Sequence, residues 1–264
     1  MIDLHAHILP GLDDGAASWD EFLEMAAACV DDGVRRVVAT PHMMPDGQYA
    51  LTAADVLPVA AEAKERLRRA GIPLALEVAG EIYLAPDLLG RVQAGELLTY
   101  PAGRRYLLVE LPGYEAPPAF TEQVFFDLQV AGITPVVAHP ERYLALSEAL
   151  FPRLVEWVER GVLFQVNGRS LLGESGPRVQ RAAERLLDSH MVHLLASDAH
   201  GVTRRPPGLA AARARAAQRV GAAMAAALVE ENPRRVLAGE PVVPWEIKRP
   251  PQRASLLARL LRRS

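Results

Sequence analysis

Nine side chains that could bind metal stand at, or just after, the ends of short apolar runs in this 264-residue sequence. They are His5, His7, Asp14, His42, Glu81, Glu110, His139, Asp198 and His200, and they include five of the seven histidines. Residues i and i+2 of an extended segment point to the same face, so His5 and His7 can reach one ion. Mixed histidine and carboxylate ligands suit divalent ions such as Mn, Zn or Fe. Because nine ligands exceed what one ion takes, we expect two or three ions that share a carboxylate and generate hydroxide at neutral pH.

Two of these ligand assignments have a competitor in the sequence. The loop that follows His7 contains a proline, two glycines and the pair Asp13–Asp14. Such a loop can bring one aspartate back over the strand end, and either member of the pair could be the one. Glu77 stands four residues before Glu81 and could take its place.

Two arginines follow ligand candidates and could clamp an anion. Arg142 comes three residues after His139, and Arg205 comes five residues after His200. A guanidinium group binds phosphate oxygens in a bidentate manner, so both are candidate phosphate-binding residues. The alternative for each is an ordinary surface ion pair.

Other reactive side chains are less suited to catalysis. Cys29 and Arg35 have the minimal spacing of a cysteine-dependent phosphatase loop, but Cys29 lies late in a predicted helix, on its apolar face. Asp31 and Asp32 would also repel a phosphate there. His190 and His193 flank the start of the last predicted strand, at the end remote from the nine ligands, and we expect them to be structural.

Short β-type runs alternate with helical patterns along the chain. The runs cover residues 2–5, 34–39, 74–79, 106–110, 134–138, 162–166 and 192–196. A first helix follows Ser18, with Glu21 completing a capping box, and ends at Gly33. Further helices are predicted at residues 52–70, 121–131, 152–160, 177–187 and 209–230, the last as two helices hinged at Gly221.

This alternation predicts an α/β fold with a parallel sheet covered by helices. Ligand candidates follow six of the seven strands, which favours a closed barrel because a barrel gathers residues from nearly every strand end. We therefore expect a single-domain, distorted (β/α)7 TIM-like barrel over residues 1–247. Residues 248–264 carry six basic and no acidic side chains and are expected to form a basic amphipathic tail.

Composition excludes several other classes of protein. The net charge of −3 gives no reason to expect a nucleic-acid partner. A single cysteine excludes an internal disulfide and fits a reducing compartment. Neither a leader peptide nor an apolar run of the ~20 residues that a bilayer span needs is evident, so we expect a cytoplasmic protein without membrane insertion. The sequence leaves open whether copies of the chain form a homo-oligomer.

The order of the motifs resembles that of a known superfamily. The chain reads HAH, TPH, two separate glutamates, AHPER and SDAH, as in the polymerase and histidinol phosphatase (PHP) superfamily. Within it, HILPGLDDG, HPERY and SDAH followed by RRPP look like the bacterial PHP-type protein-tyrosine phosphatases that act beside capsular and exopolysaccharide tyrosine kinases. The resemblance covers roughly residues 1–245. One departure is Met43, where many relatives have a second histidine.

The resemblance implies a distorted seven-stranded barrel and a trinuclear site, usually of manganese, that hydrolyses phosphotyrosine. By motif register, the metal ligands of the family correspond to the nine residues above, and its phosphate-binding arginines to Arg142 and Arg205. The expected substrate is the phosphotyrosine tail of a bacterial tyrosine kinase, attacked by a metal-activated hydroxide. The alternative is a PHP phosphatase acting on a small phosphomonoester such as histidinol phosphate.

Overall fold

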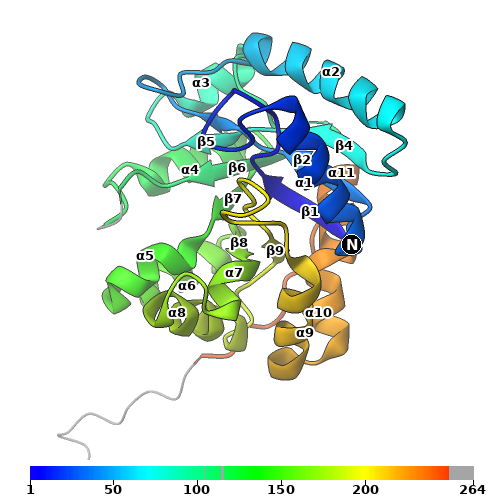
Figure 1. The fold of residues 1–264 in the computed structure, drawn as a ribbon. Coiled ribbons are helices and arrows are strands. Elements are labelled where there is room, and N and C mark those ends of the chain that lie inside the picture. The colour runs from blue at the N-terminus through cyan, green and yellow to red at the C-terminus, as the bar shows by residue number, and fades with distance from the viewer. Residues whose placement is uncertain (104, 114–115, 250–264) are drawn as a thin grey trace, which may run out of the picture.

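Strands and helices alternate along the chain (Figure 1). The computed structural model describes residues 1–103, 105–113 and 116–249. The seven expected strands are all present, and two short ones, β3 and β5, are added. The strands are β1 (Ile2–Ala6), β2 (Arg36–Ala39), β3 (His42–Met43), β4 (Ala75–Val78), β5 (Glu81–Tyr83), β6 (Tyr106–Glu110), β7 (Thr134–Ala138), β8 (Leu163–Asn167) and β9 (Leu194–Ala196).

The expected helices are also present. They are α1 (Trp19–Asp31), α2 (Ala53–Ala70), α4 (Thr121–Val130), α6 (Phe151–Glu159), α8 (Pro177–Asp188), α9 (Leu209–Val220) and α10 (Ala222–Val229). Gly221 joins the last two with a φ of 86°, which confirms the predicted hinge. Short helices were not predicted: α3 (Leu88–Gln93), α5 (Pro140–Leu146), α7 (Gly168–Leu172), α11 (Glu231–Ala238) and the 3-10 helix η1 (Glu148–Leu150).

The start of α1 differs in one detail from the predicted capping box. The Ser18 hydroxyl accepts a hydrogen bond from the backbone N–H of Glu21 (3.2 Å), as expected of an N-cap. The Glu21 carboxylate, however, accepts from the backbone N–H of Ala17 (2.9 Å), one residue before the cap itself. The carboxylate therefore fixes the chain entering the helix.

All strand pairs in the structure are parallel, which confirms the α/β class. β1, β2 and β4 form one sheet, and β3, β5, β6, β7, β8 and β9 form the other, in that order. The two sheets meet where β1 and β9 approach each other: Ala6 and Ala199 form a parallel bridge. Among the described residues, the paired strands form these two sheets and do not close into one continuous barrel.

The predicted strands at residues 34–39 and 74–79 break and continue as β3 and β5. Pro41, which has no N–H to donate, separates β2 from β3. Gly80 separates β4 from β5, and a Cβ on it would lie 2.4 Å from the Met43 sulfur. The carbonyl of Pro41 still accepts from the N–H of Glu81 (3.0 Å), so pairing continues across both breaks. The breaks thus carry the chain from one sheet to the other and leave His42 and Glu81 side by side.

Alternate residues of the strands pack in two different places. Leu108 of β6, Leu163 of β8 and Leu194 of β9 belong to an interior cluster of buried side chains. Their neighbours Leu107, Phe164 and Leu195 pack in the cluster beneath the helices. On the interior face, the next positions toward the carboxyl ends are polar, for example Glu110 after Leu108, and Gln165 after Leu163. The same strand face therefore supplies an apolar floor and then the candidate site.

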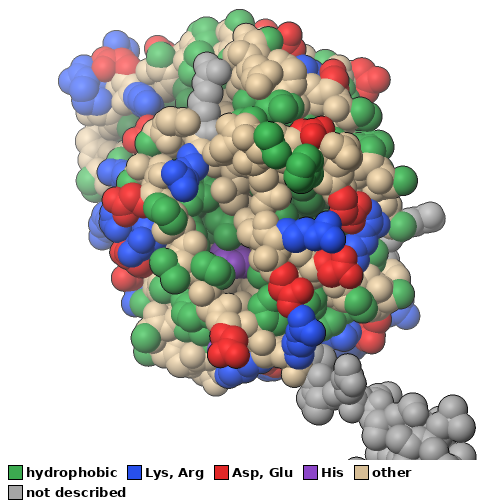
Figure 2. All heavy atoms as spheres, turned by 180° about the vertical axis from the view of Figure 1, so that it is seen from behind, with side chains coloured by type: hydrophobic (Ala, Val, Ile, Leu, Met, Phe, Trp, Pro, Cys, Tyr) green, Lys and Arg blue, Asp and Glu red, His purple; other side chains and the backbone are tan. Residues whose placement is uncertain are grey.

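Surface features agree with the composition. Acidic and basic side chains are interspersed on the rear face of the molecule (Figure 2). In the described part of the chain, no helix is both long and apolar enough to cross a membrane. Of the predicted basic tail, residues 250–264 lie outside the described residues. At its start, the backbone N–H of Lys248 donates to the carbonyl of Ser189 (3.0 Å).

The loop between β1 and α1 yields a first prediction. A Cβ on Gly15 would lie only 2.0 Å from the carbonyl oxygen of His7, so Gly15→Ala must displace the loop that carries Asp13 and Asp14. We expect the free energy of unfolding to fall by about 1–3 kcal/mol, the usual range for overpacking, as measured by denaturant unfolding. Gly90→Ala is the matched control, because it lies in α3 with open space around it. It should raise stability by ~0.5–1 kcal/mol. Equal effects of the two variants would contradict this account of the loop.

Candidate metal centre

The structure brings all nine predicted ligands together at the carboxyl ends of the strands. Three overlapping groups have ligand atoms within 4.8 Å of one another. They are His7, Asp14, His42 and His200; His5, His7 and Glu81; and His42, Glu81 and Glu110. His139 and Asp198 adjoin them, since His139 Nε2 lies 3.0 Å from Glu81 and Asp198 Oδ1 lies 3.4 Å from His5.

Glu81 lies at the middle of the cluster. Its Oε2 atom is 3.3 Å from His5 Nε2, 3.2 Å from His7 Nε2 and 3.0 Å from His42 Nδ1. Its Oε1 atom contacts His139 instead. Ligand atoms about 2.0–2.2 Å from one ion are themselves roughly 3.0–3.5 Å apart. These separations therefore fit a carboxylate that binds a cation together with the surrounding imidazoles. Glu77, the competitor on β4, belongs to none of the three groups.

His5 and His7 show most directly that the cluster suits a cation. His5 Nδ1 bonds to Gln165 Oε1 (2.8 Å), and His7 Nδ1 bonds to Asp13 Oδ2 (2.6 Å). Both partners are acceptors, so each Nδ1 donates to its partner, and in a neutral ring each Nε2 is left with a lone pair. The two Nε2 atoms nevertheless face each other at 3.2 Å. Two facing lone pairs repel, so this arrangement calls for a proton or a metal ion at the Nε2 atoms.

The two aspartates of the first loop have different roles. Asp13 accepts hydrogen bonds from His7 Nδ1 and from the backbone N–H groups of Gly15 and His42. These bonds orient the loop and the His7 ring. Asp14 Oδ1 lies 3.3 Å from His200 Nε2 and 3.5 Å from His42 Nε2. The geometry therefore favours Asp14 as the ligand and Asp13 as the residue that orients His7.

Buried polar atoms without a hydrogen-bond partner are concentrated here. Such atoms are costly in a protein interior unless a metal or water meets them. Five of the nine in the described residues belong to the cluster: Asp14 Oδ1, His42 Nδ1, Glu81 Oε2, His139 Nδ1 and His200 Nε2. The donor set, its spacing and these orphaned atoms fit divalent cations.

The carboxylates dominate the electrostatics of the cluster. Burial lowers the pKa of His42, but Glu81 and Asp14 raise it more strongly, to about 12. Burial also lowers the pKa of His7, and Asp13 overcomes this and raises it to about 9. Burial and the neighbouring Glu81 raise the pKa of Glu110 to about 7. Without a metal, the cluster therefore attracts protons instead, and protons and metal ions compete for it.

Both predicted arginines reach the cluster. Arg142 donates to Asp198 Oδ2 (2.6 Å), and Arg205 donates to Asp14 Oδ2 (2.9 Å) and lies 3.8 Å from Asp198. Their side chains are 23% and 24% exposed, whereas His5, His7 and Glu81 are at most 1% exposed. The arginines thus lie between the buried ligands and solvent, where an incoming anion would arrive.

Backbone strain also gathers at this site. Only five non-glycine residues in the described chain have positive φ, and three of them are His139 (36°), Asp198 (52°) and Arg205 (57°). Such conformations cost about 1–3 kcal/mol each and persist where the surroundings enforce them. The strain places two ligands and one arginine at points where regular strand or helix geometry would aim them elsewhere.

The sequence did not point to the residues of β8, which corresponds to the one predicted strand that no ligand candidate follows. Gln165, which holds His5, donates to Asn167 Oδ1 (2.8 Å), and Asn167 donates to Asp198 Oδ2 (2.7 Å). The backbone N–H of Asn167 is held in turn by the buried Glu141 (3.0 Å). Two polar residues at alternate positions of an apolar run were the available signal. Tyr49, whose ring stacks on His42 with centroids 5.5 Å apart, was also missed.

The residues that were discounted lie away from the cluster. Cys29 is buried on the apolar side of α1, and burial raises the pKa of its thiol far above the usual value. Buried His193 accepts a hydrogen bond from the backbone N–H of Phe164 (3.1 Å), and His190 bonds to the carbonyl of Glu246. Met43 is fully buried in the apolar core, so the family departure at this position leaves the ligand set intact.

Comparison with known proteins agrees with this geometry. Residues 1–238 match the family model for capsular polysaccharide synthesis, CpsB/CapC. The chain belongs to this family. The predicted resemblance to bacterial metal-dependent tyrosine phosphatases is thereby confirmed.

Individual CpsB/CapC relatives cover most of the chain. Tyrosine-protein phosphatase YwqE of Bacillus subtilis is 37% identical over 206 residues, which is 78% of this chain and 79% of YwqE. Tyrosine-protein phosphatase CpsB of Streptococcus pneumoniae is 30% identical over 245 residues, or 90% of this chain and 98% of CpsB. One of the crystal structures of YwqE from Bacillus subtilis and CpsB from Streptococcus pneumoniae, described as unique metal-dependent tyrosine phosphatases, superposes on this chain with a TM-score of 0.85. It is 32% identical and covers 94% of this chain and 100% of that chain.

The two glutamates near β4 and β5 give a sharp test of the metal centre. Glu81→Gln removes the charge that four histidines surround, so we expect bound divalent metal to be lost on gel filtration. Metal should also no longer raise Tm, because a ligand stabilises only the state that binds it. The measurements are elemental analysis and calorimetry with and without added Mn²⁺. Glu77→Gln is the matched control and should retain both properties. Retention of metal by Glu81→Gln would refute the central position of this residue.

The buried cysteine gives a second test. Cys29→Ala should retain phosphatase activity within about twofold, because the thiol lies in the core and burial disfavours the thiolate that a nucleophile requires. The rate is measured with an aryl phosphate in the presence of Mn²⁺. Loss of activity in a variant that keeps the wild-type circular dichroism and Tm would point to thiol chemistry.

Proposed function

We propose that the protein is a metal-dependent protein-tyrosine phosphatase. The observation that supports this best is the meeting of nine metal ligands with two partly exposed arginines in a CpsB/CapC chain. Relatives named tyrosine-protein phosphatases are 30–37% identical over most of the chain, which bears out the function predicted from the sequence. Their names do not favour the alternative of a small phosphomonoester such as histidinol phosphate.

The nine side chains that converge at the strand ends are the proposed metal ligands. We propose two or three divalent ions, with Mn²⁺ preferred and Fe or Zn as alternatives. When bound, such ions supply Lewis acidity toward a phosphoryl oxygen and lower the pKa of a coordinated water. Glu81, which four histidines surround, would hold such ions at the centre of the cluster. Asp13, Gln165 and Asn167 hold the proposed ligands in place. Orienting partners of this kind tune metal affinity by about 10–100-fold.

Arg142 and Arg205 are the proposed phosphate-binding residues. Each guanidinium group has five N–H donors, so each can keep its carboxylate partner and still donate to a phosphoryl oxygen. Because Arg142 and Arg205 both approach Asp198, their donors converge on one point beside the ligands. Charge that develops on the transferring phosphoryl group is stabilised by such fixed donors. A tyrosinate leaving group has a conjugate-acid pKa of about 10, so it requires only modest assistance.

The proposal extends to the fold, the substrate and the cellular location of the enzyme. The two sheets, joined through their broken strands and the Ala6–Ala199 bridge, are proposed to form one distorted (β/α)7 barrel over residues 1–247. The proposed substrate is the phosphotyrosine tail of a bacterial exopolysaccharide or capsule tyrosine kinase, met in the cytoplasm. A homo-oligomer is compatible with this proposal and is not required by it.

The arginine pair provides the test of the function. Wild-type protein loaded with Mn²⁺ should hydrolyse a phosphotyrosine peptide with a higher kcat/KM than histidinol phosphate. Arg142→Gln or Arg205→Gln should lower kcat/KM by about 10²-fold while metal content is retained, because a donor to the transition state is lost. Arg204→Gln is the matched control, since that side chain is 74% exposed and lies 3.8 Å from Asp14. Absence of turnover on phosphotyrosine by metal-loaded wild type would refute the proposed function.

A further inference from the structure

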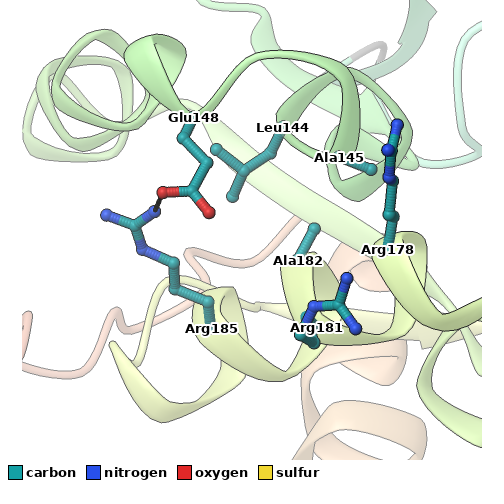
Figure 3. A pocket seen from close by; sticks show the side chains of 7 residues that line it. All are labelled: Leu144, Ala145, Glu148, Arg178, Arg181, Ala182 and Arg185. Atoms are coloured by element: carbon teal, nitrogen blue, oxygen red, sulfur yellow. Dashed lines mark hydrogen bonds and ion pairs between the residues drawn. The ribbon is translucent and has the colours of Figure 1, made fainter.

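A second cationic hollow lies beside the helix that carries Arg142. It has a volume of about 410 Å³ and is formed where α5 and η1 pack against α8. Figure 3 shows the guanidinium groups of Arg178, Arg181 and Arg185 around it. The hollow exists because α5 and α8 present the small side chains of Ala145 and Ala182 to each other, which leaves space that larger residues would fill.

The three arginines share one face of α8 because they are spaced three and four residues apart. Among the described residues, neither Arg178 nor Arg181 forms an ion pair. Arg185 stacks on Phe151 at 3.8 Å and lies 3.4 Å from Glu148, whose side chain is 88% exposed. An ion pair this exposed contributes little, so Glu148 can turn away at low cost. Three guanidinium groups against one carboxylate leave the hollow strongly cationic.

The position of the hollow connects it to the candidate active site. Ala145 lies three residues after Arg142 on α5, which is about 4.5 Å of helix rise. α8 follows β8 through the short helix α7, so its first turn, with Arg178, lies at the end of the molecule where the strands terminate. The hollow and the candidate active site therefore lie toward the same end of the molecule.

The cationic surface is larger than a single small anion would cover. An adjoining hollow of about 460 Å³ shares Arg181 and Arg185 with the first. Its remaining charged lining is Arg219, Lys248 and Arg249 together with the carboxylates of Glu184 and Asp188, so basic groups outnumber acidic ones by five to two. The excess of basic groups over the two hollows suits a chain that bears several carboxylates. A free phosphate ion would engage only one of the two hollows.

We propose that the hollow bounded by Arg178, Arg181 and Arg185 binds an acidic segment of the phosphotyrosine-bearing protein substrate. The inference rests on the proposed phosphatase function and adds a preference for substrates with carboxylates beside the phosphotyrosine. Ion pairs with such a segment act on substrate binding, so they lower KM and leave the chemical step unchanged. They also weaken as salt screens the charges.

The experiment compares matched peptides with the metal-loaded full-length protein. One peptide carries Asp and Glu on one side of the phosphotyrosine, and its partner carries Asn and Gln at the same positions, with both flanks tested in turn. Wild type should show a KM about 5–10-fold lower for one acidic peptide, a range that a few exposed ion pairs supply. In the double variant Arg178→Gln/Arg181→Gln this preference should disappear, with kcat and the rate on p-nitrophenyl phosphate unchanged. The matched control is Arg68→Gln/Arg69→Gln, which removes two exposed charges from α2 and should keep the preference.

The outcomes separate this inference from the function on which it rests. If wild type hydrolyses neither peptide nor p-nitrophenyl phosphate, the phosphatase function itself fails. If wild type is active but shows no preference, or the double variant keeps the preference, docking in this hollow is refuted. An equal loss on p-nitrophenyl phosphate in the double variant also refutes it, because that small substrate does not reach the hollow. Both arginines are exposed, so the variants should fold, which Tm verifies.

Discussion

The structure depends on the burial of negative charge. Glu81, Asp198, Glu110 and Asp14 gather within one cluster of histidines, and the first two are almost completely buried. Removing carboxylates from water costs several kcal/mol each unless cations compensate for it. The surrounding imidazoles compensate in part, as the raised pKa of His42 and His7 shows. The facing Nε2 atoms of His5 and His7 and the carboxylate oxygens without hydrogen-bond partners mark the places where metal ions would compensate for the rest of the negative charge.

The peculiarities of the backbone follow from that requirement. A regular strand points alternate side chains to one face, which is enough to place Glu110 or Gln165. A regular strand could not place His42 and Glu81 side by side and also lead from one sheet into the other. The breaks at Pro41 and Gly80 make this arrangement possible. Positive φ at His139 and Asp198 turns two further ligands inward. Irregular backbone is therefore concentrated where several ligands must meet at one point.

The sequence was sufficient to predict which side chains meet in the cluster, and most of the helices and strands, because both have strong local signals. Strand-end histidines and carboxylates stand out against apolar runs, and helices of ten or more residues have clear periodicity. Helices such as α5 and α7 are too short to show a period, so they were missed. The choice between Asp13 and Asp14 depends on which carboxylate turns toward His7 Nδ1, a property of the folded loop alone. Gln165 and Asn167 gain their roles only through contacts with His5 and Asp198 that join distant segments.

Charge balance links the two halves of the site. When the imidazoles are neutral, as metal ligands are, the carboxylates outnumber the two guanidinium groups of Arg142 and Arg205. The five carboxylates are those of Asp13, Asp14, Glu81, Glu110 and Asp198. A site with this excess repels a phosphate dianion, and the arginines are held by Asp198 and Asp14. Two divalent cations, as proposed, would reverse the sign of the balance. Metal and anionic substrate would then bind with positive coupling, as linkage requires when each ligand improves the site for the other. On the proposed function, Arg142 and Arg205 would therefore bind a substrate phosphate only after cations have bound to the carboxylates.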